Sequence, residues 1–148
     1  LYTGQELVFG KQLAKLKYSY HASDYRQERP DLLGENDLQA LFKDYNGQTY
    51  WASFNLHNFN PSIRPKWLSL SAGYGADGML SANTDSRQEN RGRPYRSYYL
   101  SLDVDFEKIQ TDSKFLKATF KILDCFKMPF PAMEFKEGRS NQFHWLFF

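Results

Sequence analysis

A strict alternation of side chains from Arg96 to Glu107, RSYYLSLDVDFE, constrains the fold of this chain more than any other feature. The apolar side chains stand at the even-numbered positions Tyr98, Leu100, Leu102, Val104 and Phe106. The odd-numbered positions carry serine and aspartate, with Tyr99 among them. A period of two residues predicts a β-strand. Its apolar row spans about 30 Å at roughly 3.3 Å per residue, which is long for a soluble strand and suits a tilted membrane strand.

Other stretches of the chain repeat this alternation or are rich in aromatic residues. Together they predict six strands: Leu13 to His21, Gln48 to Asn58, Trp67 to Gly75, Arg96 to Glu107, Pro129 to Phe135 and Gln142 to Phe148. The 148 residues suit a single domain. We therefore expect a mainly β fold: an antiparallel sheet, barrel-like or a partial barrel, with one polar and one apolar face.

Two other stretches have helical periodicity. Ser113 to Lys127 carries phenylalanine, leucine and isoleucine on one side and lysines on the other, which predicts one basic amphipathic helix. Such a helix either packs on a core or lies in a membrane interface. Leu1 to Gln12 is expected to be the end of a preceding helical segment, and Glu35 to Tyr45 a short helix with Leu38, Leu41 and Phe42 facing inward. Ala76 to Pro94 has no pattern and is expected to be a loop.

The shared parity of the strands predicts which side chains lie together. The polar face is expected to carry Lys15, Lys17, Ser53, Asn55, His57, Ser69, Ser71, Ser101, Asp103 and Asp105. We expect the two lysines to pair with the two aspartates across this face. The membrane-facing or partner-facing side chains are expected to include Leu100, Leu102, Val104, Phe115 and Phe120.

Alternation alone does not separate a membrane sheet from a soluble sheet that has one wet face. Three features favour the bacterial outer membrane: long strands, aromatic residues near strand ends, and Phe148 as the last residue of an aromatic strand. A terminal phenylalanine resembles the assembly signal of outer-membrane barrels, which Leu146 also fits and His144 does not. No run of about 18 apolar residues is present, so no membrane-spanning helix is expected.

Composition argues against several other classes of protein. A net charge of +2 is too small to indicate nucleic-acid binding. Cys125 is the only cysteine, so no internal disulfide forms, and its apolar surroundings predict a buried thiol. The histidines lack metal-ligand spacing, and we expect no metal and no cofactor. A dinucleotide-binding site requires a helix directly after its glycine motif. The glycines of GYGADG, from Gly73 to Gly78, are not followed by a helical pattern, so they do not indicate such a site.

Catalysis has only three candidate residues on the predicted polar face: His57, Ser101 and Asp103. These are the residue types of a Ser-His-Asp site. Their spacing matches no triad signature, and no G-x-S-x-G motif is present. A polar sheet face explains the same residues without catalysis, so we expect no catalytic residues.

Several strings of the sequence are distinctive. They are LLGEN at Leu32 to Asn36, KDYNGQTYW at Lys43 to Trp51, PKWL at Pro65 to Leu68, GYGADGM at Gly73 to Met79 and LSLDVD at Leu100 to Asp105. In these strings the chain resembles the C-terminal portion of the YfiM-like family of predicted bacterial envelope lipoproteins, whose function is unknown. The resemblance implies a Gram-negative envelope protein at the outer membrane, with a longer helical part before Leu1, and it supplies no catalytic residues.

These observations lead to one expected function and two alternatives. We expect a non-enzymatic protein of the outer membrane that serves as an accessory subunit. Its partners would be membrane lipid and a larger β-barrel protein, because six strands are fewer than the eight of the smallest single-chain barrels. The first alternative is an outer-membrane barrel hydrolase acting on lipid or lipopolysaccharide. The second is a soluble binding module.

Overall fold

The computed structural model describes residues 12–23, 26–27, 30–78, 95–136, 138 and 140–147. The expected helix over Leu1 to Gln12 falls outside these residues except for Gln12, as do most of the loop from Ala76 to Pro94 and the terminal Phe148.

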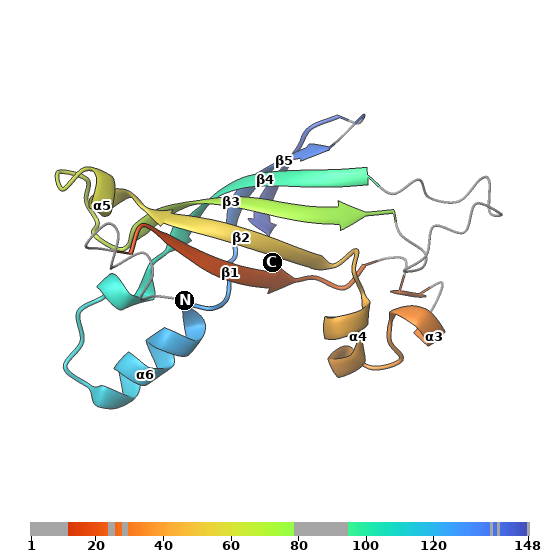
Figure 1. Cartoon of the computed structure of the whole chain (residues 1–148), viewed down its shortest axis with the longest axis horizontal. Helices are drawn as coiled ribbons and strands as arrows, with labels where there is room; N and C mark the ends of the chain where they lie inside the picture. The colour runs from red at the N-terminus through yellow and green to blue at the C-terminus, as the bar shows by residue number, and fades with distance from the viewer. Residues whose placement is uncertain are drawn as a thin grey trace.

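The described chain forms one six-stranded antiparallel sheet, drawn in Figure 1. Its strands are β1 (Ala14–Tyr20), β2 (Gln48–Asn55), β3 (Leu68–Asp77), β4 (Tyr95–Val104), β5 (Phe130–Lys136) and β6 (Gln142–Phe147). They lie in chain order, each hydrogen-bonded to the next. The prediction of a mainly antiparallel β fold is confirmed. The sheet is open, with β1 and β6 at its two edges in the part of the chain that the structure describes.

Two strands end earlier than the alternation predicts. After β2 the chain turns into the short helix α5 (Leu56–Phe59), where the Asn55 side chain accepts a hydrogen bond from the Asn58 backbone N–H. After β4 it forms the 3-10 helix η1 (Phe106–Lys108). Both turns end their strands at the same end of the sheet, after Asn55 and Asp105, whose residue types favour turns. The alternation continues past both residues, so it predicts strands that are too long.

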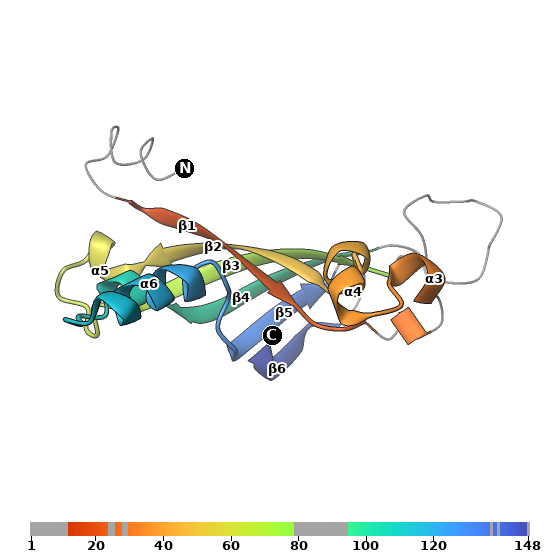
Figure 2. The same cartoon turned by 90° about the horizontal axis from the view of Figure 1, so that it is seen from below.

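Three further helices are described, and they lie at opposite ends of the sheet. α3 (Pro30–Leu33) and α4 (Asp37–Lys43) lie at the end where β1 connects to β2. α6 (Lys114–Leu123) lies at the other end, which is also the end where α5 lies (Figures 1 and 2). Ser113 caps α6, and its side chain accepts a hydrogen bond from the Leu116 N–H.

The basic amphipathic helix is confirmed, but it ends at Leu123 and not at Lys127. The next residues return to the edge of β1: the Tyr18 N–H donates to the Cys125 carbonyl at 3.0 Å, and the Lys127 N–H donates to the Tyr18 carbonyl at 2.9 Å. The Cys125 thiol is exposed, so the prediction of a buried cysteine is wrong. Leaving the helix turns the cysteine away from the interior.

The two faces of the sheet are buried in the opposite sense to a soluble sheet. On the outer face, which carries the apolar row, Leu16 is 73% exposed and Leu100 41% exposed. The inner face is the opposite surface, and its polar side chains are buried. Its buried members include Lys17, Ser19, Thr49, Trp51, Ser53, Asn55, Ser69, Ser71, Ser97, Tyr99, Ser101, Asp103, Ala132 and Glu134.

The helix α4 shows the same inversion. Its Leu38 and Phe42 are 77% and 73% exposed, so the prediction that they face inward is wrong, while Leu41 is half-buried. Only Ala40 of this helix is buried. Apolar side chains on the outside are therefore a property of both the sheet and this helix.

A glycine and a tryptophan shape the inner face. Trp51 pairs with Gly73 across β2 and β3, and Tyr99 pairs with Gly73 from the other side. A Cβ atom at Gly73 would lie 2.7 Å from the Trp51 ring. The missing side chain leaves room for Trp51, which contacts Tyr99 with ring centroids 5.7 Å apart and donates from Nε1 to Ser19 Oγ.

An unbroken row of aromatic side chains crosses five strands on the outer face. Successive residues are cross-strand neighbours, in the order Tyr18, Tyr50, Tyr74, Tyr98 and Phe135. We call these five residues the aromatic row. Tyr18 and Tyr50 lie 5.7 Å apart between ring centroids, as do Tyr74 and Tyr98. Beyond the row, the same face of β4 carries the charged Arg96.

Candidate functional site

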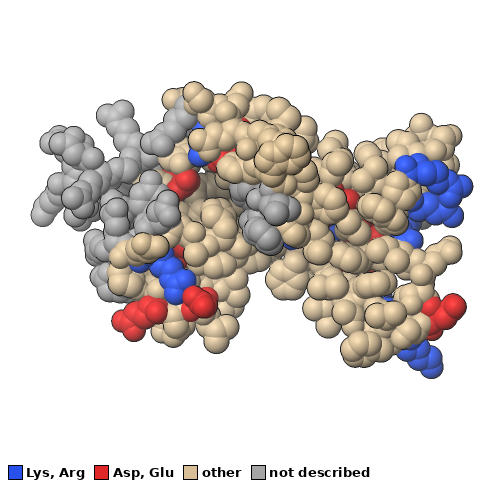
Figure 3. All heavy atoms as spheres, turned by 180° about the vertical axis from the view of Figure 1, so that it is seen from behind, with Lys and Arg blue, Asp and Glu red and all other residues tan. Residues whose placement is uncertain are grey.

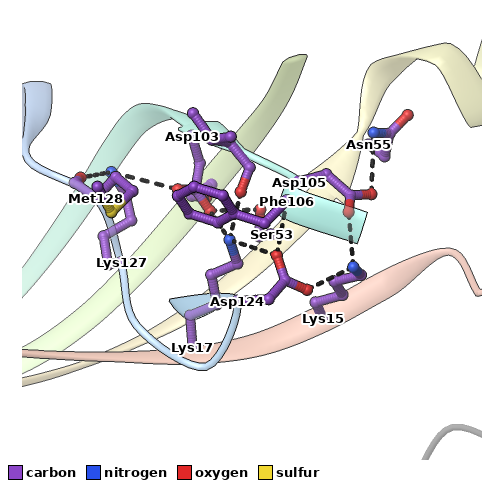
Figure 4. Close-up of polar contacts among 12 residues, drawn as sticks. Lys15, Lys17, Ser53, Asn55, Asp103, Asp105, Phe106, Asp124, Lys127 and Met128 are labelled. Atoms are coloured by element: carbon purple, nitrogen blue, oxygen red, sulfur yellow. Dashed lines mark hydrogen bonds and ion pairs between the residues drawn. The ribbon is translucent and has the colours of Figure 1, made fainter. Parts of the chain in front are cut away.

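The inner face holds a buried cluster of lysines and aspartates, drawn in Figure 4. Lys17 of β1 reaches Asp103 of β4, with Nζ 3.0 Å from Oδ2, and both side chains are fully buried. The same carboxylate accepts hydrogen bonds from Ser53 on β2 at 2.8 Å and from Ser71 on β3 at 3.1 Å. The predicted pairing of Lys17 with Asp103 is therefore confirmed.

These contacts require a strongly curved sheet. β1 and β4 are separated by two strands, which in a flat sheet would place them about 14 Å apart. Because Lys17 and Asp103 are in direct contact, the sheet must curve so that both side chains lie on its concave side. Small serines on the two strands between them leave the necessary space.

A second lysine lies among three carboxylates at the end of the cluster. Lys15 Nζ is 2.7 Å from Asp105 and 2.8 Å from Glu107, and it also pairs with Asp124. The predicted pairing of Lys15 with Asp105 is confirmed. These three carboxylates lie close enough together to hold a metal ion. The Lys15 ammonium contacts all three, so it supplies there the positive charge that a cation would bring.

Lys127 enters the cluster from the segment after α6. Its Nζ donates to the Leu102 carbonyl at 2.9 Å and to the Met128 carbonyl at 2.7 Å, and it lies 5.1 Å from the centroid of the Trp51 ring. Burial lowers the pKa of Lys127 to about 8. The negative charge of Asp103 raises this pKa and the positive charge of Lys17 lowers it, but burial has the largest effect. Lys127 and Asp124 were not predicted to lie here, because helical periodicity assigned Lys127 to a solvated face.

Glu134 organises a second polar cluster, near the other sheet edge. Its carboxylate accepts a hydrogen bond from Tyr99 Oη at 2.9 Å and lies 2.7 Å from His144 Nε2 and 3.3 Å from Lys136 Nζ. The fully buried Ser97 hydroxyl lies beside Tyr99 and Glu134. Sequence reasoning missed this cluster, although the parity of Tyr99 and Ser97 on β4 placed both on the polar face.

The three catalytic candidates do not come together. Ser101 donates to the backbone carbonyls of Leu102 and Pro131. Asp103 is engaged by Lys17 and the two serines. His57 lies in α5, with Nδ1 3.1 Å from the Ile63 carbonyl oxygen. The prediction that His57 lies on the polar face of the sheet is wrong, because the strand ends at Asn55.

The other predicted polar residues lie where parity places them. Asn55 is buried and donates to Asp105 Oδ2 at 3.0 Å and to the Lys66 carbonyl at 2.9 Å. Ser69, one strand further along, is buried as well.

The residues predicted to face a membrane or partner are mostly accessible. Leu100 and Leu102 are 41% and 42% exposed, and Val104 is half-buried at the end of the same row. Phe115 is 77% exposed. Phe120 is half-buried and stacks on Phe106, with ring centroids 5.6 Å apart, so it contacts the protein itself.

Among the described residues, no helix has both the length and the apolar character needed to cross a membrane. Comparison with family models, with curated proteins and with solved structures finds no match to this chain. The resemblance to the YfiM-like family therefore stays a prediction.

Proposed function

We propose that this chain is a non-enzymatic protein of the Gram-negative outer membrane that meets lipid with its outer face and serves as an accessory subunit of a larger assembly. The observation that carries the proposal is the inverted burial of the sheet. Ser71 and Asp103 are fully buried, whereas Leu100 and Leu102 are exposed. In water this arrangement is unfavourable, because apolar side chains stay in contact with solvent. Against lipid the same side chains are removed from water, which is favourable.

The aromatic row supports a membrane location independently. Tyrosines gather at the membrane–water interface, because the ring is apolar and the hydroxyl is polar. On β4 the outer face is apolar from Tyr98 to Val104, which spans about 20 Å along the strand at about 3.4 Å per residue. This row is shorter than the span of about 30 Å expected from the alternation, because the strand ends at Val104. The row therefore marks one border of an apolar band. On the face drawn in Figure 3, the prominent charged side chains lie toward the two ends and the middle is almost entirely uncharged.

The open sheet supports the need for a partner. An unpaired strand edge in lipid leaves backbone groups unsatisfied, at a cost of several kcal/mol each. The chain covers part of the β1 edge itself, through the bonds between Tyr18 and the segment from Cys125 to Lys127. β6 is the other edge, with Trp145 78% exposed on it. A strand of a larger β-barrel protein fits that edge.

A hydrolase acting on lipid is the second candidate, and one contact favours it. In many hydrolytic sites a carboxylate orients the catalytic imidazole through a hydrogen bond. Glu134 and His144 form such a contact, with Nε2 of His144 2.7 Å from the carboxylate. Ser97 and Tyr99 would be the hydroxyl groups nearest to that carboxylate. Loss of lipid hydrolysis in His144→Ala, with folding retained, would favour this candidate over an accessory role.

The test of the proposed location is flotation of the full chain with membranes. The protein should float with outer-membrane fragments, stay bound after alkaline and high-salt washing, and need detergent for release, because the apolar band holds it. Recovery of a folded chain in the wash would contradict a lipid-facing sheet and favour the soluble binding module.

A further inference from the structure

Helix α6 has more apolar surface than it uses to pack on the protein. Phe120 and Leu123 are half-buried, and Phe120 stacks on Phe106. Phe115 and Ile122 are 77% and 65% exposed and share a neighbouring flank, because they are two helical turns apart. This flank has no packing partner in the part of the chain that the structure describes.

Lysines border the exposed flank. Lys114, Lys117 and Lys121 lie on one side of α6 at spacings of three and four residues. Lys108 of η1 precedes the helix. None of these four lysines forms an ion pair with an acidic side chain among the described residues. The surface therefore combines bulky apolar groups with an excess of positive charge.

The place of α6 in the fold fits a second membrane border. β4 runs from the aromatic row, at Tyr98, to Val104, and the chain then enters η1 and α6. Figures 1 and 2 both show that α6 lies at the end of the sheet where β4 ends. The aromatic row crosses β4 near its other end, at Tyr98, so α6 lies at the end of the apolar band opposite the row. A membrane that begins at the row would end near this helix.

A groove lies beside the helix and has a volume of about 530 Å³. Phe106, Ile109 and Phe120 give it apolar walls. Its charged lining consists of Lys117 and Lys121 together with Asp112 and Glu107, and Glu107 is already paired with Lys15, so the two lysines leave an excess of positive charge. The size and chemistry suit a small anionic head group attached to the start of an acyl chain.

We propose that α6 is a binding surface for phospholipid head groups, with phosphate oxygens at Lys117 and Lys121 and the side chains of Phe115 and Ile122 among the acyl chains. Ammonium groups complement phosphate, and an amphipathic helix rich in lysine and phenylalanine lies in the interface plane. This inference rests on the proposed membrane location and adds to it the ligand class and the residues that bind it.

The single cysteine makes a direct test possible. Cys125 is exposed and lies three residues after Ile122, so an environment-sensitive fluorophore attached to it reports on this flank. The full chain is reconstituted in phosphatidylcholine vesicles with or without phosphatidylglycerol. Adding phosphatidylglycerol should shift the emission to the blue and allow quenching by head-group spin labels, and 0.5 M salt should reverse much of this change.

Two double variants, each with two basic residues replaced by glutamate, differ only in the position of the reversed charges. Lys117→Glu with Lys121→Glu should abolish the phosphatidylglycerol response. Arg64→Glu with Lys66→Glu changes the net charge equally, at exposed positions that follow α5 at the same end of the sheet, and should keep the response. Equal loss in both pairs would show a general charge effect and overturn the site.

Other outcomes separate this inference from the proposed function. A label that stays water-exposed while the protein floats with vesicles would overturn the α6 surface alone. A label equally protected with neutral lipid would remove the head-group role, and protection in detergent without phospholipid would point to a protein contact. Failure of the wild-type chain to float would contradict the membrane location itself.

Discussion

At the scale of single residues, Asp103 links more of the inner face than any neighbouring side chain. Its carboxylate accepts from Lys17, Ser53 and Ser71, which come from three different strands. All three partners are buried. Its contacts therefore hold β1, β2, β3 and β4 in their curved arrangement, and a buried lysine depends on it for charge compensation.

Asp103→Ala should be strongly destabilising. It leaves the Lys17 ammonium buried with only Asp124, 3.3 Å away, as an acidic partner, and breaking one partner of a buried ion pair typically costs about 3–5 kcal/mol. Denaturant unfolding in detergent micelles measures the change. Asp37→Ala is the control, because that carboxylate is 96% exposed in its pair with Arg26 and its loss should change little. Equal effects would mean that the inner face is hydrated.

At the scale of elements, a substitution in the apolar row on the outer face of β4 distinguishes a sheet that faces lipid from one that faces water. Leu100→Arg should reduce membrane assembly by about 2–4 kcal/mol, because a charge in an apolar band is costly there. Leu38→Arg on α4 is the control, because Leu38 is 77% exposed but lies outside the sheet. Flotation and heat-modifiable migration measure insertion. If both variants insert normally, the row faces water, where exposed substitutions are nearly neutral.

The sequence predicted the elements better than it predicted their ends. Alternation located β1 to β4, aromatic content located the last strand, and parity paired Lys15 and Lys17 with Asp105 and Asp103. Alternation separates the side chains into two faces, but it does not show which of the two faces is buried. The helix pattern also continued past Leu123, where backbone bonds to Tyr18 redirect the chain.

The Glu134 cluster was beyond sequence reasoning for a different reason. Its members come from β4, β5 and β6, and their meeting depends on the register of two strand pairs. The pairing of β5 with β6 contains a shift between Phe130 and Ala132. A shift of one residue moves a side chain to the other face, so His144 could be brought to Glu134 only once the pairing was known.

At the scale of the whole molecule, the six described strands form an open, curved sheet whose two edges differ. The β1 edge is partly covered by the segment from Cys125 to Lys127. No described strand pairs with the far side of β6. Partner binding is therefore expected at β6, and the two edges offer matched exposed side chains for testing it: Leu16 on β1 and Trp145 on β6.

Trp145→Lys should release the chain from its complex, because a lysine on an edge strand opposes pairing with another strand. Leu16→Lys adds the same charge at the opposite edge, at a comparable cost in lipid, so the two variants differ mainly in which edge they change. The fraction of Leu16→Lys that enters the membrane should keep the complex. The readout is the stoichiometry of the complex after mild-detergent extraction, by light scattering. Release by Leu16→Lys alone would move the partner to β1. A wild-type chain that runs as a stable monomer would contradict the accessory role and favour a self-contained membrane protein, for which the pairing of His144 with Glu134 becomes the leading candidate for chemistry.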